Sequence, residues 1–139
     1  MLNPKLFLHT KICFLFNVSL LFFIELNAQY VQDGAKLVGA NGSDYAHQGE
    51  ASAISGDGNT AIVGGRSDDN NTGAAWIYTR IAGNWVQQGP KLVPNDEIIA
   101  ACFGFSVSLS SDGNTAIIGG NIDNGGFGAA WIFTRKNGV

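Results

Sequence analysis

Residues 55–65 read SGDGNTAIVGG, and residues 110–120 read SSDGNTAIIGG. A second pair recurs at the same spacing of 55 positions, because GAAWIYTR at residues 73–80 returns as GAAWIFTR at residues 128–135. A period of this size is typical of one small supersecondary unit that stacks on its neighbours. The sequence therefore predicts an array of repeated units instead of one irregular domain.

The two copies extend over residues 30–84 and 85–139 and align without a gap. Each copy contains four strand-like segments that are bounded by turn residues. In the second copy Phe105, Val107 and Leu109 alternate with serines, and this period of two predicts a strand with one apolar and one polar face.

The next segments of the second copy are also typical of strands. Residues 115–118 form a continuous apolar run, which indicates an interior strand covered on both faces. Residues 128–135 carry aromatic residues and isoleucine, which suit a pleated surface. The fourth segment, residues 85–93, contains Pro90, and proline cannot donate to a ladder of hydrogen bonds. We therefore expect this strand at the outer edge.

Four antiparallel strands repeated in tandem, with no helical pattern between the units, favour a radial β-propeller over a stacked array. The predicted fold class is all-β, with about two four-stranded antiparallel blades in an incomplete ring. Residues 30–38 match the fourth strand at residues 85–93, so this first segment could complete the last blade of a ring. Trp76 and Trp131 are expected in contacts between blades. Two blades leave apolar faces uncovered, which calls for further repeats or self-association.

The N-terminal segment, residues 1–28, has the layout of a secretory signal peptide. Lys5 and Lys11 precede an apolar run at residues 12–24, and Ala28 is a small residue just before Gln29. We therefore predict that residues 1–28 are removed by cleavage between Ala28 and Gln29. An uncleaved membrane anchor is the alternative.

Cleavage would leave residues 29–139 as an exported domain, either secreted or at the cell surface, with no membrane insertion. The whole chain has a formal net charge of −3, so neither nucleic acid nor an anionic membrane is favoured as a partner. Cys13 lies in the leader and Cys102 would be the only cysteine left, so no internal disulfide is expected. The chain ends one position before the next tryptophan of the pattern, which predicts an incomplete fragment; a natural stop is the alternative.

Both copies resemble the FG-GAP repeat, the blade unit of integrin alpha-chain propellers and of many secreted bacterial proteins. The second copy carries Phe103 and Gly104, then DGN at residues 112–114 and GAAWIF at residues 128–133, whereas the first copy has Gln48 in place of the phenylalanine. The resemblance covers residues 30–139. It implies a seven-bladed propeller that binds ligands, in which some blades hold calcium in an Asp-rich hairpin loop.

Calcium is not predicted here, because each matching hairpin has one carboxylate, Asp57 or Asp112, and calcium takes six to eight oxygen ligands. A turn in which the aspartate bonds its own backbone is expected instead. A second acidic cluster at residues 67–71 is expected to be an exposed polar loop. Asp68 and Asp69 would be the first place to look for calcium.

His47 lies near Ser43, Asp44 and Glu50 in sequence, but nothing marks an oriented base or an oxyanion hole. We expect a solvated loop histidine.

Cys102, at the equivalent position of the second copy, has apolar neighbours and is expected to be buried and unactivated. No catalytic, cofactor-binding or metal-binding residue is predicted, and the chain is not expected to be an enzyme.

The expected function is that of a non-catalytic exported β-propeller module for adhesion or for binding an extracellular protein or glycan. Two alternatives stay open. The chain could be the accessory propeller of a larger secreted enzyme, or a purely structural surface repeat.

Overall fold

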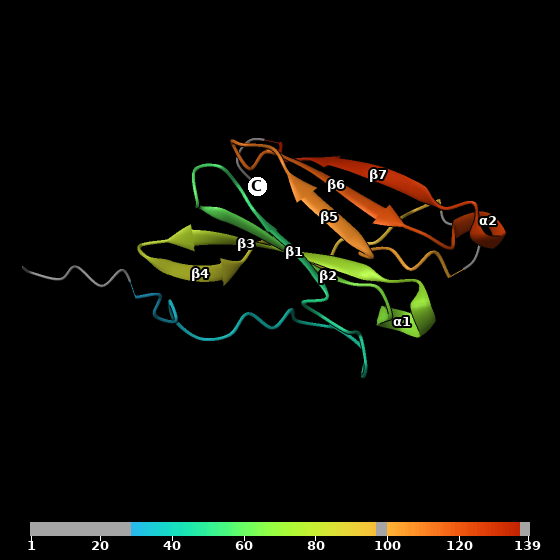
Figure 1. Cartoon of the computed structure of the whole chain (residues 1–139), viewed down its shortest axis with the longest axis horizontal. Helices are drawn as coiled ribbons and strands as arrows, with labels where there is room; N and C mark the ends of the chain where they lie inside the picture. The colour runs from blue at the N-terminus through green and yellow to red at the C-terminus, as the bar shows by residue number, and fades with distance from the viewer. Residues whose placement is uncertain (1–28, 97–99, 137–139) are drawn as a thin grey trace, which may run out of the picture. The chain divides into compact units, whose positions relative to one another are not determined.

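The computed structural model describes residues 29–96 and 100–136. These residues are mostly β, with two antiparallel sheets and two short helical turns (Figure 1). Both sheets belong to one compact body that begins at Gln32. The predicted signal peptide, residues 1–28 with Ala28 at the cleavage site, lies outside the described residues.

The first sheet has four strands in the order β1-β2-β3-β4. Its elements are β1 (Ala51–Ile54), β2 (Thr60–Gly65), α1 (Asp68–Asn71), β3 (Ala74–Ile81) and β4 (Asn84–Gln87). The prediction that the fourth strand lies at the outer edge is confirmed for this sheet. β4 is shorter than predicted, because Gly89 has a left-handed backbone (φ 68°) and Pro90 follows it.

The second sheet has three strands in the order β5-β6-β7. Its elements are β5 (Ser106–Leu109), β6 (Thr115–Gly120), α2 (Asp123–Gly126) and β7 (Ala129–Thr134). Ile62 pairs with Ile77 in the first sheet, and Ile117 pairs with Ile132 at the matching positions of the second copy. β6 is the interior strand, as predicted, but Ile117 is 45% exposed because one face of this sheet is uncovered.

Residues 30–38 do not form the predicted fourth strand. A strand needs the free edge of another strand as its partner, and the edge of the second sheet at β7 does not pair with this segment. The two sheets therefore do not close into a ring. Phe105 also differs from its prediction, since it precedes β5 and is 45% exposed.

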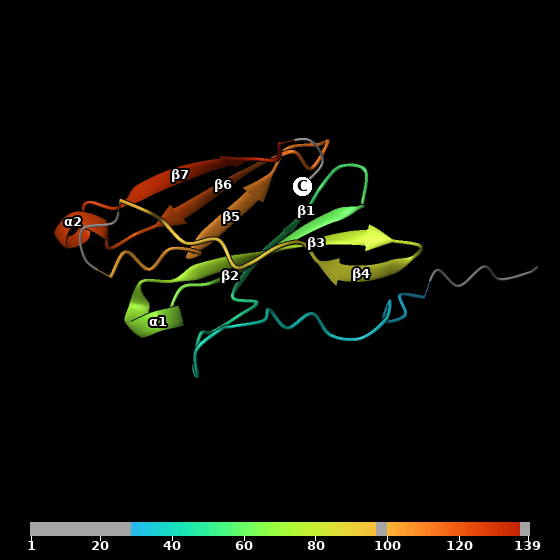
Figure 2. The same ribbon diagram turned by 180° about the vertical axis from the view of Figure 1, so that it is seen from behind.

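The second sheet packs on one face of the first sheet, as two layers (Figures 1 and 2). Phe103 lies at the centre of this contact and is fully buried. Its ring meets Trp131 edge-on with 5.3 Å between the ring centroids, and it meets Phe133 at 5.8 Å. The buried residues of this contact come from both sheets and from the segment between them: Ile62, Ala75, Phe103, Ala116 and Ile118.

Glycines let the backbone of the second unit approach the first. The Phe103 amide donates to Thr72 O at 3.0 Å, and Phe103 forms a parallel bridge with Gly73. A Cβ on Gly73 would lie 2.1 Å from Phe103 O, and a Cβ on Gly104 would lie 2.3 Å from Ala74 O. Both glycines also have positive φ angles. A side chain at either position would push the two sheets apart.

Gln48 occupies the position in the first copy that matches Phe103, and it acts differently. Its Oε1 accepts a hydrogen bond from the Gly39 amide at 2.7 Å, and its Nε2 donates to Gly39 O at 3.2 Å. Gln48 thus makes a polar contact within the segment before β1, whereas Phe103 packs its apolar ring between the two sheets.

The two matching tryptophans also have different surroundings. Trp131 packs at the contact between the sheets, as predicted. Trp76 was expected in such a contact, but it lies on the opposite face of the first sheet, where Leu37 and Ala46 cover it. Its Nε1 donates to Ala40 O at 2.9 Å. The segment before β1 thus covers this face of the first sheet.

The Phe103→Ala variant should lose about 3–5 kcal/mol of unfolding free energy, because the substitution empties the centre of the contact between the sheets. Phe105→Ala is the matched control, since that ring is partly exposed and lies close by in sequence. Urea denaturation followed by circular dichroism measures both. Equal losses for the two variants would contradict the central role of Phe103.

Candidate functional site

The two hairpin aspartates use their carboxylates within their own turns. Asp112 Oδ1 accepts hydrogen bonds from the Ser110 hydroxyl at 2.6 Å and from the Asn114 amide at 3.0 Å. These bonds stabilise the ionised form and lower the pKa of Asp112 to about 2. Asp57 makes the equivalent bonds in the first hairpin, and its pKa is also lowered. The predicted self-bonding turns are confirmed.

Asp68 is fully buried, so the prediction of an exposed polar loop is wrong for this residue. Its Oδ1 accepts a hydrogen bond from the Ser43 amide at 2.6 Å, and its Oδ2 accepts one from the Lys91 ammonium. Burial alone would raise the pKa of Asp68, but the bonds from Lys91 and Ser43 outweigh it and hold the pKa below its ordinary value. Lys91 is distant from Asp68 in sequence, which is why the local pattern did not reveal the pair.

Both carboxylate oxygens of Asp68 are therefore already bonded, to Ser43 and to Lys91, and do not form an open calcium site. Asp69 is exposed, and its backbone amide donates to the Ser43 hydroxyl at 2.8 Å. Within residues 29–96 and 100–136, no group of three or more His, Cys, Asp or Glu side chains is placed to hold a metal ion.

His47 does not assemble a triad with its sequence neighbours. Its Nδ1 lies 3.7 Å from Glu50 Oε2, and both side chains are about half exposed. The Ser43 hydroxyl is engaged by the Asp69 amide instead, and Asp44 is exposed. The prediction of a solvated loop histidine is confirmed.

Cys102 is buried, as predicted, and has a left-handed backbone with φ 54°. Its amide donates to Asn71 O at 2.8 Å. The thiol thus lies at the junction between the two repeated units. No sequence pattern singled out Arg66, whose pKa is raised because its guanidinium pairs with the Glu50 carboxylate.

The turns α1 and α2 lie at the same end of the two sheets (Figures 1 and 2). Residues between the sheets connect them, since the Cys102 amide donates to Asn71 O and the Ile122 amide donates to Ala101 O at 3.3 Å. We call this region the loop end. It is defined by exposed polar and aromatic residues from both units: Tyr45, Asp69, Asn70, Asn71, Asn124 and Phe127.

Two aromatic rings are strongly exposed at the loop end, with Tyr45 86% and Phe127 88% accessible. Tyr45 belongs to the segment that Ser43 ties to α1, and Phe127 directly follows α2. Asp69, Asn70 and Asn124 have left-handed backbones, a conformation that Asp and Asn tolerate better than other side chains. Sequence reasoning noted the polar residues but not the two aromatic rings.

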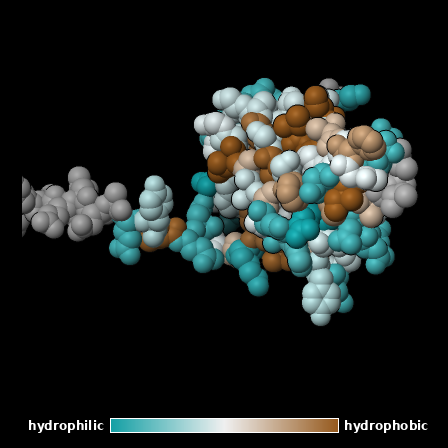
Figure 3. All heavy atoms as spheres, turned by 45° about the vertical axis from the view of Figure 1, so that its right-hand side comes forward, coloured by the Kyte–Doolittle hydropathy of each residue, from teal (hydrophilic) through white to brown (hydrophobic). Residues whose placement is uncertain are grey.

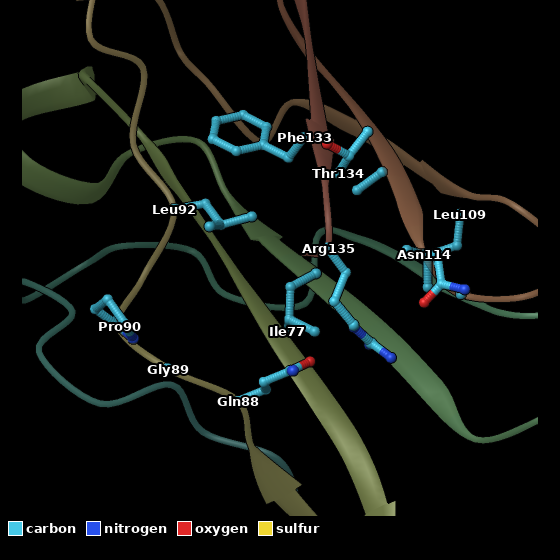
Figure 4. Close-up of a pocket in the computed structure, with 12 residues that line it drawn as sticks. Ile77, Gln88, Gly89, Pro90, Leu92, Leu109, Asn114, Phe133, Thr134 and Arg135 are labelled. Atoms are coloured by element: carbon cyan, nitrogen blue, oxygen red, sulfur yellow. The ribbon is translucent and has the colours of Figure 1, made fainter. Parts of the chain in front are cut away.

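A cavity of about 310 Å³ opens between the sheets at the other end of β6 (Figure 4). Its walls come from β3, from the segment between Gln88 and Leu92, from β5, β6 and the hairpin that joins them, and from residues 133–135. No sequence motif pointed to it, because its lining residues are spread along the chain from Ile77 to Arg135.

The face of the second sheet that points away from the first sheet is uncovered. Ile117 is 45% exposed and Ile132 is 68% exposed, whereas the equivalent Ile62 and Ile77 pack against the second sheet. Hydrophobic residues, brown in Figure 3, accordingly reach the surface among polar ones. Among the described residues no helix is long and apolar enough to cross a membrane.

Comparisons with known protein families, with curated proteins and with solved structures found no match to this chain.

Lys91→Met should cost about 3–5 kcal/mol of unfolding free energy, because it leaves the Asp68 carboxylate buried without its cation. Lys36→Met is the matched control at the equivalent position of the first copy, where the lysine is exposed. Chemical denaturation of both variants at neutral pH measures the difference. A Lys91→Met variant as stable as the control would contradict a structural role for the pair.

Proposed function

We propose that this chain is a non-catalytic, exported β-propeller repeat module that binds an extracellular protein or glycan. The observation that carries the proposal is the way in which the second sheet stacks on the first through Phe103 and Gly104. The FG-GAP resemblance of residues 30–139 agrees with this contact, since the phenylalanine and glycine that define the motif lie at its centre.

The contact between the sheets joins two different faces. The first sheet contributes Ile62 and Ile77, while the second contributes Ile118, Trp131 and the preceding Phe103. A contact of this head-to-tail kind can be repeated, because each added unit exposes the face that the next unit needs. Short antiparallel sheets stacked in this way are typical of propeller blades.

The uncovered face of the second sheet supports the same proposal. Ile117 and Ile132 hold the positions that receive the second sheet in the first unit. Exposed apolar faces in soluble proteins mark interaction surfaces. Further repeats or additional copies of the chain are the partners that we propose for this face.

The loop end is the proposed ligand-binding surface. Tyr45 and Phe127 offer rigid aromatic area, and Asn70 and Asn124 offer adaptable amide donors and acceptors. Loops held by a rigid scaffold commonly carry binding function. Backbone hydrogen bonds of residues 101 and 102 hold α1 and α2 in one region, so both units can contact one ligand.

A non-catalytic role is supported by the contacts of the reactive side chains. Glu50 pairs with His47 and Arg66, Asp68 is paired with Lys91, and Cys102 is buried. Export is supported by the signal-peptide layout of residues 1–28, and we propose a secreted or cell-surface location.

Binding at the loop end is tested with a glycan array and with a cell-adhesion assay. The double variant Tyr45→Ala/Phe127→Ala should bind about tenfold more weakly, because exposed aromatic anchors commonly contribute most at such surfaces. Val86→Ala, at an exposed position of β4, is the control. Binding that the double variant leaves unchanged would place the ligand elsewhere, and no binding at all would favour a purely structural repeat.

Ile132→Glu should reduce concentration-dependent self-association, because a charge on the uncovered face opposes its burial in a contact. Ile81→Glu is the matched control, since Ile81 is similarly exposed near the end of β3. Sedimentation velocity over a range of protein concentrations measures the effect. Equal association of the wild type and both variants would show that this face is not the contact.

A further inference from the structure

The cavity between the two sheets has apolar walls and a polar rim (Figure 4). Ile77, Leu92 and Phe133 form much of the wall. Arg135 and Gln88 add polar side chains to the lining of the cavity (Figure 4). A volume of about 310 Å³ lies at the small end of the range for ligand pockets, which suits a small molecule.

The equivalent arginine of the first unit shows what the Arg135 guanidinium can bind. Arg80 holds the position in the first copy that matches Arg135, and its Nη2 lies 2.6 Å from Asp33 Oδ2. The same guanidinium also stacks on Trp85, 4.8 Å from the ring centroid. The first unit therefore supplies its own carboxylate to this arginine.

The second unit has no carboxylate at the position that corresponds to Asp33. Gln88 stands there, so an amide replaces the acid. Among residues 29–96 and 100–136, Arg135 forms no ion pair, and its Nη2 donates to the Thr60 hydroxyl at 3.2 Å. The side chain is only partly exposed. A guanidinium that has no carboxylate partner within the described part of the chain thus borders an apolar cavity.

We propose that this cavity binds a small amphipathic carboxylate, with the apolar chain between the sheets and the carboxylate on Arg135. A guanidinium binds a carboxylate through two parallel charge-assisted hydrogen bonds. The ligand carboxylate takes the place that Asp33 holds in the first unit. The apolar part is buried against Ile77, Leu92 and Phe133.

This site is separate from the proposed adhesion surface. α2 follows the C-terminal end of β6, whereas Gly113 and Asn114 of the cavity precede its N-terminal end. The two sites lie at opposite ends of the same strand. A failure of either proposal leaves the other intact.

Hexanoate and its neutral isostere hexanamide test the proposal by calorimetry and by chemical-shift titration of the full chain. The wild type should bind hexanoate at least about tenfold more tightly than hexanamide, the contribution expected of hydrogen bonds to a charged group. Arg135→Gln should abolish this preference and keep the weak binding of hexanamide. Arg80→Gln, in the other unit, should leave the preference unchanged.

Gln88→Glu provides an independent variant, because it supplies the carboxylate that Asp33 provides in the first unit. Hexanoate binding should fall at least about tenfold in Gln88→Glu, while hexanamide binding is kept. Circular dichroism of each variant checks the fold. The proposal is overturned if the wild type shows no hexanoate binding at millimolar concentration, or if Arg135→Gln and Gln88→Glu both bind hexanoate as the wild type does.

Discussion

The packing of the second sheet on the first depends on the absence of side chains at Gly64, Gly73 and Gly104. A Cβ on Gly64 would lie 2.2 Å from Gly104 O, closer than any real contact of that kind. Backbone meets backbone here, which lets the Phe103 ring reach the centre of the apolar contact. The same approach lets the Cys102 amide donate a hydrogen bond to Asn71 O at the end of α1. At the other end of the sheets the Asp57 amide donates to Ser111 O at 3.3 Å, and the cavity beside Arg135 opens there.

Local patterns in the sequence predicted most of the strands. The alternation of Val107 and Leu109 with serines, and the turns centred on Asp57 and Asp112, depend on neighbours that are close in sequence. Such features are set by backbone preference and by hydrogen bonds inside one hairpin. The prediction of a fourth strand at residues 30–38 was wrong for the opposite reason, since a strand forms only where the edge of another strand pairs with it, and no local pattern shows whether that pairing occurs.

The candidate sites were harder to predict because their parts are distant in sequence. Asp68 looks like one member of an exposed acidic loop until Lys91 is placed beside it. The Cys102 amide donates to Asn71 O of the other unit, and the cavity draws on residues from both sheets. One difference between the two repeated units points to the cavity site, namely that Gln88 stands in the second unit where the first unit has Asp33. That difference has meaning only after the structure shows that Asp33 pairs with Arg80.

Gln48 makes the two units unequal as templates for a gene duplication. A gene duplication that copies the second unit would produce a sheet with its own phenylalanine and glycine, ready to pack on the uncovered face at Ile117 and Ile132. A copy of the first unit would carry an amide that bonds to the Gly39 backbone at that position. A duplicate of the second unit would therefore keep the residues of the contact between the sheets, whereas a duplicate of the first unit would not.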